Sequence, residues 1–451
     1  MPQDTLQRLR AGQLAGVREL KLSCGLTQFP PEIFDLADTL EILDLTGNAL
    51  RELPPDLHRL HRLRVLFCSG NRFTRLPPSI GRCPLLSMVG FRGNQITEAS
   101  DTSLPPNLRW LILTDNRLEE LPPGIGYRPR LQKLMLAGNR LQHLPEELAQ
   151  CRQLELLRVS ANRLDTLPAW LLAMPRLSWL AYAGNPMTEA AETQAIAHTQ
   201  AATLAWSNLD IGAALGEGAS GVILEATLRG QEGDIAVAVK RFKGQITSDG
   251  LPRSELAACL AAGSHPHLIG ALGLLEGDPS GAQGLVMRRI DASYQPLAGP
   301  PSFESCTRDV YDPSQRFTLA TALKLALGVA DAGAHLHSRG IVHGDLYAHN
   351  TLWNDQGQCL LGDFGAACFL PLDQPEVAEA VMRIEVRALG CLLQELSSRA
   401  YIGNPAQSQV LQALSALQER CLALEVMSRP SMAQVQAELL QWQQASEGDR
   451  R

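Results

Sequence analysis

A repeat of 22 or 23 residues runs through the first two fifths of the chain and constrains its fold more than any other feature. It begins at Leu40 as LEILDLTGNALRELPPDLHRLHR, in the frame L-x-x-L-x-L-x-x-N-x-L-x-x-L-P. Six further copies begin at Leu63, Leu86, Leu108, Leu131, Leu154 and Leu177. One unit of this length cannot bury its own apolar side, so the units must stack on one another into a curved solenoid.

Each letter of the frame has a physical role. The L-x-L piece predicts one short strand whose leucines point into a shared core, while the Asn turns the chain and can bond neighbouring backbone groups. These seven copies resemble the leucine-rich repeat family, and Val17–Pro30 resembles a degenerate first copy. The resemblance implies an α/β leucine-rich-repeat solenoid in which Asn48 and its equivalents are structural.

The non-leucine positions of the predicted strands should line the concave face of the solenoid, because side chains alternate along a strand. These positions are unusually apolar, and they include Phe67, Trp110 and Trp179. Aromatic side chains that gather on one surface often mark a contact with another protein. We expect the three to bind a protein substrate or regulator, or to receive the chain's own second half. The alternative is that flanking side chains cover them.

The sequence changes character from Leu209 onward. The stretch LDIGAALGEGASGVILEATL alternates like a β-hairpin around Gly216, Gly218 and Gly221. Glycines let backbone amides come close to phosphate oxygens. The motif continues as GxGxxGxV, and VAVK follows, in which Lys240 ends an apolar run. Together these features predict a phosphate-binding loop followed by a strand that carries a functional lysine.

In this order the motifs resemble a protein kinase domain. The predicted helix SELAACLAAG supplies Glu255, HGDLYAHN covers His343–Asn350, and DFG covers Asp363–Gly365. EVRALG, from Glu385, and SRPSM, at 428–432, resemble later kinase motifs. The resemblance spans the whole second half and implies an α+β bilobal protein-kinase-like domain after the solenoid.

The resemblance implies a role for each of these residues in phosphoryl transfer, which consists mainly of positioning and charge neutralisation. Lys240 would hold the α- and β-phosphates of ATP, Glu255 would fix its ammonium, and Asp345 would orient the acceptor hydroxyl. Asn350 and Asp363 would offer oxygen ligands to Mg²⁺. The other nucleotide-binding residues that the resemblance implies are Leu215, Gly216, Glu217, Gly218, Ala219, Ser220, Gly221, Val222, Ala238, Met287 and Leu352.

Four features depart from the kinase pattern. The Arg that usually precedes the catalytic Asp, and that receives an activation-loop phosphate, is replaced by Gly344. The segment Asp363–Glu385 is short, lacks a clear A-P-E motif and contains no Ser, Thr or Tyr. We therefore expect a kinase that activation-loop phosphorylation does not switch. Tyr347 and His349 match neither Ser/Thr nor Tyr kinases at the positions that separate these classes, and Glu385 stands in place of an Asp.

Two other functions remain open. The HGDxxxxN motif without A-P-E also resembles small-molecule phosphotransferases of the aminoglycoside and choline kinase type. A pseudokinase scaffold would bind nucleotide without phosphorylating protein. The glycine-rich loop, the VAVK motif and the attached repeats favour a protein kinase, acting on Ser or Thr rather than on Tyr.

The charge and cysteine content of the chain limit which partners it can bind and which compartment suits it. Residues 1–200 carry 22 basic and 20 acidic side chains, and residues 201–451 carry 18 and 27. Neither half has the basic excess of a nucleic-acid binder, so we expect no nucleic-acid partner. The ten cysteines stand singly, and neither a signal peptide nor a membrane span is predicted, which favours a cytoplasmic protein. Only five of the 40 basic residues are Lys, a bias that we interpret as bacterial-type genome composition.

The expected organisation has three parts. A leucine-rich-repeat solenoid covers residues 1–187, a helical cap and linker cover 188–206, and the kinase domain covers 207–445. An extension at 291–317, between the expected hinge and the next helix, has no assigned role.

Overall fold

The computed structural model describes residues 2–198, 202–218, 221–230, 233–244, 246–247, 249–403 and 405–448. Its contacts divide the chain into two compact units, Met1–Met174 and Pro175–Arg451. The second unit begins inside the predicted repeat range 1–187, so the last repeat, which starts at Leu177, belongs to the same unit as the kinase-like half.

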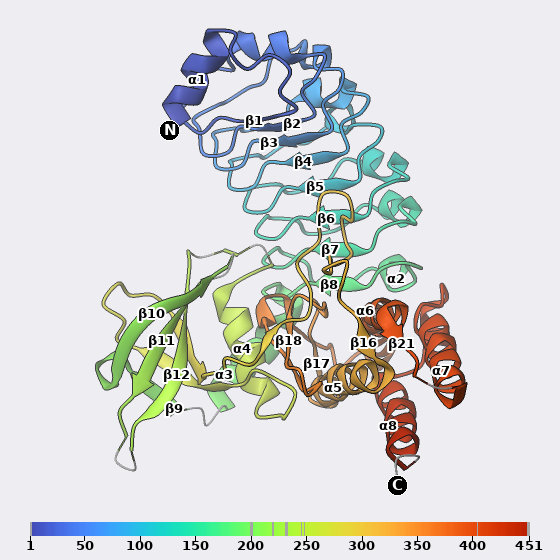
Figure 1. Ribbon diagram of the computed structural model, residues 1–451. Helices are drawn as coiled ribbons and strands as arrows, with labels where there is room; N and C mark the ends of the chain where they lie inside the picture. The colour runs from blue at the N-terminus through green and yellow to red at the C-terminus, as the bar shows by residue number, and fades with distance from the viewer. Residues whose placement is uncertain are drawn as a thin grey trace. The chain divides into compact units, whose positions relative to one another are not determined.

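The first unit is a solenoid of short parallel strands that follow one another in chain order (Figure 1). From the Leu40 copy onward, each strand begins two residues after the first leucine of its repeat, at a position predicted to face outward. The predicted α/β solenoid is therefore confirmed. The strands are β1 (Glu19–Lys21), β2 (Ile42–Asp44), β3 (Val65–Phe67), β4 (Met88–Gly90), β5 (Trp110–Ile112), β6 (Lys133–Met135) and β7 (Leu156–Arg158).

Short helices return the chain from one strand to the next. Several begin with a proline of the L-P-P motif, because the fixed φ of proline suits the first turn of a helix. The α-helices are α1 (Pro2–Arg10) and α2 (Ala169–Leu172). The 3₁₀ helices are Pro31–Leu36, Leu57–Arg59, Pro78–Arg82, Asp101–Ser103, Pro123–Tyr127 and Glu146–Gln150.

The repeat asparagines are buried and tie neighbouring coils together. Asn71, for example, donates to the carbonyl oxygens of Leu45 at 2.9 Å and Cys68 at 3.0 Å, and its own oxygen accepts from the N–H of Leu50 at 2.9 Å. Each buried amide satisfies backbone groups that the short strands leave unpaired. The prediction that these residues are structural is confirmed.

The second unit opens with the last repeat and the linker. It contains β8 (Trp179–Ala181), then α3 (Pro186–His198), then a strand β9 (Ala202–Ala205). The predicted helix over 188–206 is therefore wrong from Ala202 onward, and residues 199–201 lie outside the described residues. β9 departs from the helix because it pairs in parallel with the edge of the kinase sheet, a tertiary contact that overrides local propensity.

A mixed sheet forms the first lobe of the kinase half, in the order β10-β11-β12-β14-β13-β9. Its remaining strands are antiparallel to their neighbours, and helix α4 (Pro252–Ala262) follows β12 in the chain. These strands are β10 (Leu209–Glu217), β11 (Gly221–Leu228), β12 (Ile235–Phe242), β13 (Ala271–Glu276) and β14 (Gly284–Arg288).

The second lobe is mainly helical. Its helices are α5 (Leu319–Ser338), α6 (Pro375–Arg399), α7 (Pro405–Cys421) and α8 (Met432–Gly448). Its short strands are β15 (Gln295–Pro296), β16 (Phe317–Thr318), β17 (Ile341–Val342), β18 (Thr351–Trp353), β19 (Cys359–Leu361), β20 (Cys368–Phe369) and β21 (Ala400–Tyr401). The second unit also has 3₁₀ helices at Trp206–Asn208, Phe364–Ala366 and Val426–Ser428.

Helix α5 is the one described helix that is long and apolar enough to cross a membrane. However, 61% of its apolar window is buried inside the protein, where α5 contacts α6 and α8. Its side chains therefore serve as the core of the helical lobe. Its start is capped by Thr318, whose hydroxyl accepts a hydrogen bond of 3.0 Å from the N–H of Thr321.

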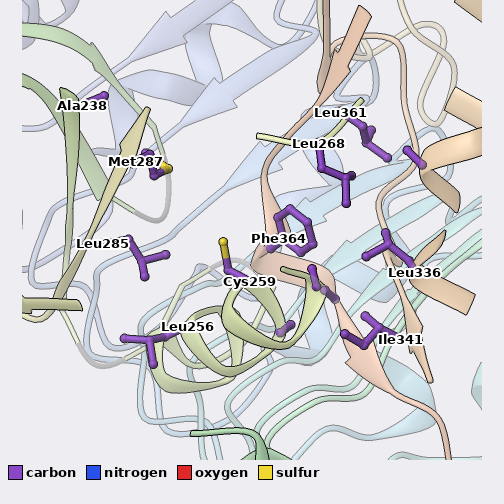
Figure 2. Close-up of a cluster of buried hydrophobic side chains, with 14 of the residues drawn as sticks. Ala238, Leu256, Cys259, Leu268, Leu285, Met287, Leu336, Ile341, Leu361 and Phe364 are labelled. Atoms are coloured by element: carbon purple, nitrogen blue, oxygen red, sulfur yellow. The ribbon is translucent and has the colours of Figure 1, made fainter. Parts of the chain in front are cut away.

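Two hydrophobic clusters among the described residues hold the kinase half together. One lies on one face of the first-lobe sheet and includes Val237 and Val239. The other joins the two lobes: Ala238 of the sheet, Cys259 of α4 and Phe364 of the helical lobe belong to the same cluster (Figure 2). Because side chains alternate along β12, the valines enter the first cluster while Ala238 and Lys240 face the other way.

Candidate active site

The ammonium of Lys240 lies between two carboxylates. It forms an ion pair with Glu255 of α4, and its Nζ lies 3.5 Å from Oδ1 of Asp363. Lys240 and Glu255 are both buried, whereas the side chain of Asp363 is 51% exposed. Three residues predicted from separate motifs thus meet at one point.

Burial and neighbouring charges act in opposite directions on this pair. Burial lowers the pKa of the Lys240 ammonium, but the carboxylates of Asp363 and Glu255 outweigh it, so the pKa lies above its usual value. Burial also raises the pKa of Glu255 to about 7, although Lys240 opposes this shift. Above that pH both partners are charged and the ion pair is complete.

The turn that carries Asp363 is held by the next residue. The Phe364 ring is buried in the interlobe cluster, close to Cys259 of α4 (Figure 2). Asp363 itself has a φ of 57°, in the left-handed region, and its Oδ1 accepts from the N–H of Gly365 at 3.3 Å. Strain of this kind persists where the surrounding structure enforces it, and it is commonest at functional sites.

Asp345 is fixed by the loop around it. The Nδ2 of Asn350 donates to the backbone oxygen of Asp345 at 2.9 Å and to its Oδ2 at 2.8 Å. The buried His343 ring donates from Nε2 to the carbonyl of Gly362 at 2.9 Å, and it lies 5.4 Å from the Phe364 ring. His343 therefore supports the loop through the carbonyl of Gly362.

Glu385, which stands in place of the usual Asp, binds the backbone of the same loop. It is fully buried on α6, accepts from the N–H of Gly344 at 2.7 Å, and lies 2.7 Å from Nε2 of His337. Burial raises the pKa of Glu385, but the hydrogen bond and charge of His337 outweigh it and hold the pKa below its usual value. A carboxylate at this position thus supports the catalytic loop despite its longer side chain.

Most of the predicted nucleotide-binding residues lie on the strands of the first lobe. Ala238 and Met287 are buried, and they are paired opposite each other on β12 and β14. Leu215 is exposed, while Val222 and Leu352 are half-buried. Apolar side chains of this kind are suited to covering a flat base on both sides.

The glycine-rich hairpin has the open backbone expected of a loop that covers the phosphates of a nucleotide. A side chain added at Gly216 or Gly218 would meet nothing within 4 Å, so both backbones face open space. At Gly221, in contrast, an added Cβ would lie 2.4 Å from the carbonyl oxygen of Arg241. The side chain of Glu217 turns away and pairs with Lys243. Ala219 and Ser220 lie outside the described residues.

The two predicted metal ligands offer hard oxygen donors, and their backbones are neighbours, because the N–H of Gly362 donates to the carbonyl of Asn350 at 2.9 Å. The Asp363 carboxylate is half exposed, and Asn350 turns its amide nitrogen to Asp345, which leaves the amide oxygen pointing elsewhere. Among the described residues, no group of three or more His, Cys, Asp or Glu side chains could hold a metal by itself. Mg²⁺ is commonly held by one or two carboxylate or amide oxygens together with substrate phosphates and water, so these residues fit it.

The three predicted partner-binding residues separate into two kinds. Phe67 and Trp110 are half-buried on the repeat strands, and the ammonium of Lys133 lies 4.2 Å from the Trp110 ring centroid. Trp179 is only 1% exposed and stacks on Tyr347 of the kinase half, with ring centroids 4.2 Å apart. The expectation that Trp179 is open to a separate protein is therefore wrong; it receives the chain's own kinase half instead.

One feature of the site has no signal in the sequence. Asp309, from the extension at 291–317, is buried and accepts from the backbone N–H of His349 at 2.9 Å and from its Nδ1 at 2.7 Å. Nearby, Arg308 pairs with Glu395 of α6 at 2.8 Å. The extension is thus fastened beside the catalytic loop by partners 40 and 87 positions away in the chain.

Comparisons with known families agree with this geometry. A family described as protein tyrosine and serine/threonine kinases matches residues 209–399. Leucine-rich repeat families match 39–60, 62–83, 106–164 and 129–187. The fold and the site therefore define a protein kinase domain, and the chain combines that domain with N-terminal leucine-rich repeats.

Individual relatives are kinases of several specificities. A probable serine/threonine-protein kinase, kinY of Dictyostelium discoideum, is 28% identical over 176 residues, which is 36% of this chain and 28% of the relative. The serine/threonine/tyrosine-protein kinase HT1 of Arabidopsis thaliana is 39% identical over 51 residues, 11% of this chain and 13% of the relative. The tyrosine-protein kinase Mer of Mus musculus is 28% identical over 164 residues, 35% of this chain and 16% of the relative. In each case the match spans less than a third of the relative's length.

Proposed function

We propose that the chain transfers the γ-phosphoryl group of ATP to a hydroxyl of a protein, on Ser or Thr rather than on Tyr. The observation that carries this proposal is the assembled contact of Lys240 with Glu255 and Asp363. A lysine without these partners would be an ordinary surface charge. The name of the probable serine/threonine kinase kinY supports the choice of acceptor.

Each residue of the site has a separate role in the proposed phosphoryl transfer. Lys240, held by Glu255, places a positive charge where the α- and β-phosphates enter, and the glycine hairpin covers them with backbone amides. Asp345, oriented by Asn350, accepts the proton of the attacking hydroxyl and aligns its oxygen with the phosphorus. The Lys240–Glu255 pair acts strongly because it is buried, where little water screens its charges.

We further propose that Asn350 and Asp363 hold Mg²⁺ through their side-chain oxygens. The ion would neutralise charge that develops on the transferring phosphoryl group. Asp363 suits this task because its carboxylate is half exposed and its position is fixed by the strained turn and by Phe364.

We propose that the repeats recruit a protein substrate or regulator, without a nucleic-acid partner, and that the protein is cytoplasmic. The contact surface is centred on the half-buried Phe67 and Trp110, with Lys133 over the indole ring. Aromatic and cationic side chains that lie together are typical of interaction surfaces. None of the cysteines among the described residues forms a disulfide, which suits a reducing compartment.

One observation favours a second candidate, a small-molecule phosphotransferase. Helix α6 begins at Pro375, so only residues 366–374 separate the DFG turn from that helix. A long activation segment usually forms the shelf on which a peptide lies, and so short a connection leaves little material for it. The attached repeats weigh against this candidate because they recognise protein surfaces in other chains.

The experiment that separates the two candidates offers both kinds of acceptor to the purified full chain with labelled Mg-ATP. Label on a mixture of generic proteins, with phosphoserine or phosphothreonine after acid hydrolysis, would support the proposal. ADP release that only small hydroxylated compounds stimulate would support the second candidate. Nucleotide binding without either product would support a scaffold.

A further inference from the structure

The segment Pro175–His198, here called the junction segment, contacts the parts of the kinase that must be ordered for catalysis. It comprises β8, α3 and the turn between them, and it belongs to the same compact unit as the kinase lobes. In this chain the activation segment has no hydroxyl to phosphorylate, and Gly344 offers no side chain to receive a phosphate. Some other contact must therefore hold the catalytic loop and the activation segment.

Trp179 holds the catalytic loop. Its Nε1 donates to the carbonyl of Leu346 at 3.0 Å, and its ring stacks on Tyr347 with an interplanar angle of 6°. Leu346 and Tyr347 directly follow Asp345, so these contacts restrict the backbone that carries the catalytic carboxylate. Stacked aromatic rings attract each other beyond the effect of the area that they bury.

Tyr182 holds the activation segment. Its hydroxyl donates to the carbonyl of Phe369 at 3.0 Å, and its backbone N–H donates to the Sγ of Cys368 at 3.1 Å. The tyrosine is 1% exposed. The last repeat is also fixed to helix α6, because Arg387 donates to the Oγ of Ser178 at 2.7 Å.

Glu192 of α3 holds the helix that carries Glu255. It is buried, and its Oε2 accepts from the Oγ of Ser254 at 2.7 Å, one residue before Glu255. Its Oε1 accepts from the N–H of Gly184 and the Oγ1 of Thr188, both at 2.7 Å. Helices α3 and α4 are in contact (Figure 1), so Glu192 links the turn after β8 to the active position of α4.

We propose that the junction segment is a built-in activator of the kinase domain, with Trp179, Tyr182 and Glu192 as positioning residues. It takes the part that a phosphorylated activation loop plays elsewhere, since it orders the catalytic loop, the activation segment and α4 together. The expected effect on the transfer rate rests on the proposed function. The expected effect on the order of the catalytic loop, the activation segment and α4 does not. Variants that keep the side-chain size, such as Tyr182→Phe and Glu192→Gln, should release the local structure at low cost in global stability. Trp179→Ala also empties a buried site, so it should lower global stability as well.

The test uses full-length Trp179→Ala and Glu192→Gln, each with a matched control. Trp170→Ala removes a half-buried tryptophan of the preceding repeat, and Glu189→Gln changes an exposed glutamate of the same helix. We expect kcat to fall about 10- to 100-fold in Trp179→Ala and Glu192→Gln with KM for ATP little changed. Both controls should stay at the wild-type rate. Trp179→Phe, which keeps a stacking ring, should recover part of the loss.

Hydrogen exchange provides a readout that does not need activity. In Trp179→Ala, the amides of 345–350 should exchange about 10-fold faster than in the wild type. In Tyr182→Phe, which loses only a hydroxyl, the amides of 363–374 should exchange about 10-fold faster than in the wild type. Unchanged exchange and an unchanged kcat would overturn the inference, whether or not transfer is to protein. Faster exchange in these variants, together with a wild-type chain that transfers no phosphate, would uphold the ordering and overturn the proposed function alone. If Trp179→Ala fails to fold, Tyr182→Phe and Glu192→Gln decide between these outcomes.

Discussion

The backbone N–H of Gly344 donates a hydrogen bond of 2.7 Å to the carboxylate of Glu385, which is buried on helix α6. The two residues are 41 positions apart, yet this contact fixes the entrance to the catalytic loop. Glu385 also pairs with His337, so it joins three elements of the helical lobe through one carboxylate. Its removal should therefore affect both stability and catalysis.

Glu385→Gln should lower the free energy of unfolding of the kinase half by about 3 kcal/mol, because it removes a buried carboxylate that binds both His337 and the N–H of Gly344. The folded pKa of Glu385 lies below its ordinary 4.5. Its stabilising contribution is therefore complete above that pH and is lost as the pH falls through the lowered value. Urea unfolding at pH 7 and pH 4 should show a large difference between wild type and variant at pH 7 and a smaller one at pH 4. An equal difference at both values would contradict this assignment.

The transfer rate should rise with pH around neutrality because of Glu255. Its pKa is about 7 in the folded protein, so acidification protonates it and removes the counter-charge of Lys240. The raised pKa means that ionised Glu255 costs stability: its contribution is complete below 4.5 and is lost as the pH rises through about 7. Glu255→Gln should therefore lower the rate at pH 8 about 100-fold, flatten the pH profile and leave the melting temperature equal or higher. A variant that keeps the wild-type pH profile would show that another group titrates.

Gly344→Arg restores the arginine that kinases usually carry before the catalytic Asp. It should inactivate the protein and should not make it respond to activation-loop phosphorylation. Gly344 has a φ of +71°, and an added Cβ would lie 2.3 Å from the carbonyl oxygen of Ala366 and 3.0 Å from that of Leu180. Gly344→Arg should cost about 2 kcal/mol or more of stability. Gly277→Ala is the matched control, since its φ is +74° and nothing lies within 4 Å. Phosphatase treatment of the wild type should leave the transfer rate unchanged, and a large drop would contradict this account.

The pair of His349 and Asp309 should couple the 291–317 extension to the catalytic loop in a pH-dependent way. Burial lowers the pKa of His349, but the hydrogen bond and charge of Asp309 outweigh it and raise the pKa above its usual 6.5. The contribution to stability is therefore complete below 6.5 and is lost as the pH rises through the raised value. A double-mutant cycle with His349→Gln and Asp309→Asn should give a coupling of about 1 to 3 kcal/mol at pH 6 and less at pH 9. The same coupling at both values would mean that the pair does not depend on charge.

Trp110→Ala should weaken protein recognition without affecting nucleotide use. The ring is half-buried, so its removal should cost little stability, while KM for a protein acceptor should rise several-fold and KM for ATP should stay the same. Trp170→Ala, outside the predicted concave positions, serves as the comparison. Identical acceptor kinetics in both variants would exclude Trp110 from the contact surface.

Local patterns in the sequence predicted the repeated parts of this fold well. The strand starts at Ile42, Val65 and Met88 follow from the leucine spacing, because each coil has the same local requirements. The Lys240, Glu255 and Asp363 constellation followed from the order of motifs. In these regions the residues that carry the signal are also those that make the contacts.

The junction segment could not be predicted, because its contacts join residues far apart in the chain. Trp179 and Leu346 are 167 positions apart, and nothing in the repeat pattern distinguishes Trp179 from the less buried Trp110. The absence of Arg at Gly344 was visible in the sequence, but its cause was not: the carbonyl oxygens of Ala366 and Leu180 occupy the space. Similarly, β9 replaces the end of the predicted linker helix because β13 offers a free edge.

The measurement that tests the central claim most directly is the initial rate of labelled phosphate transfer from Mg-ATP to protein, in wild type and in Asp345→Asn. The variant keeps the size of the side chain and should bind nucleotide with unchanged affinity. Our account predicts that its rate falls about 100- to 10,000-fold, as for the loss of a general base. A variant that labels protein at the wild-type rate would contradict the assignment of Asp345. A wild-type chain that labels no protein would contradict the proposal of a protein kinase activity.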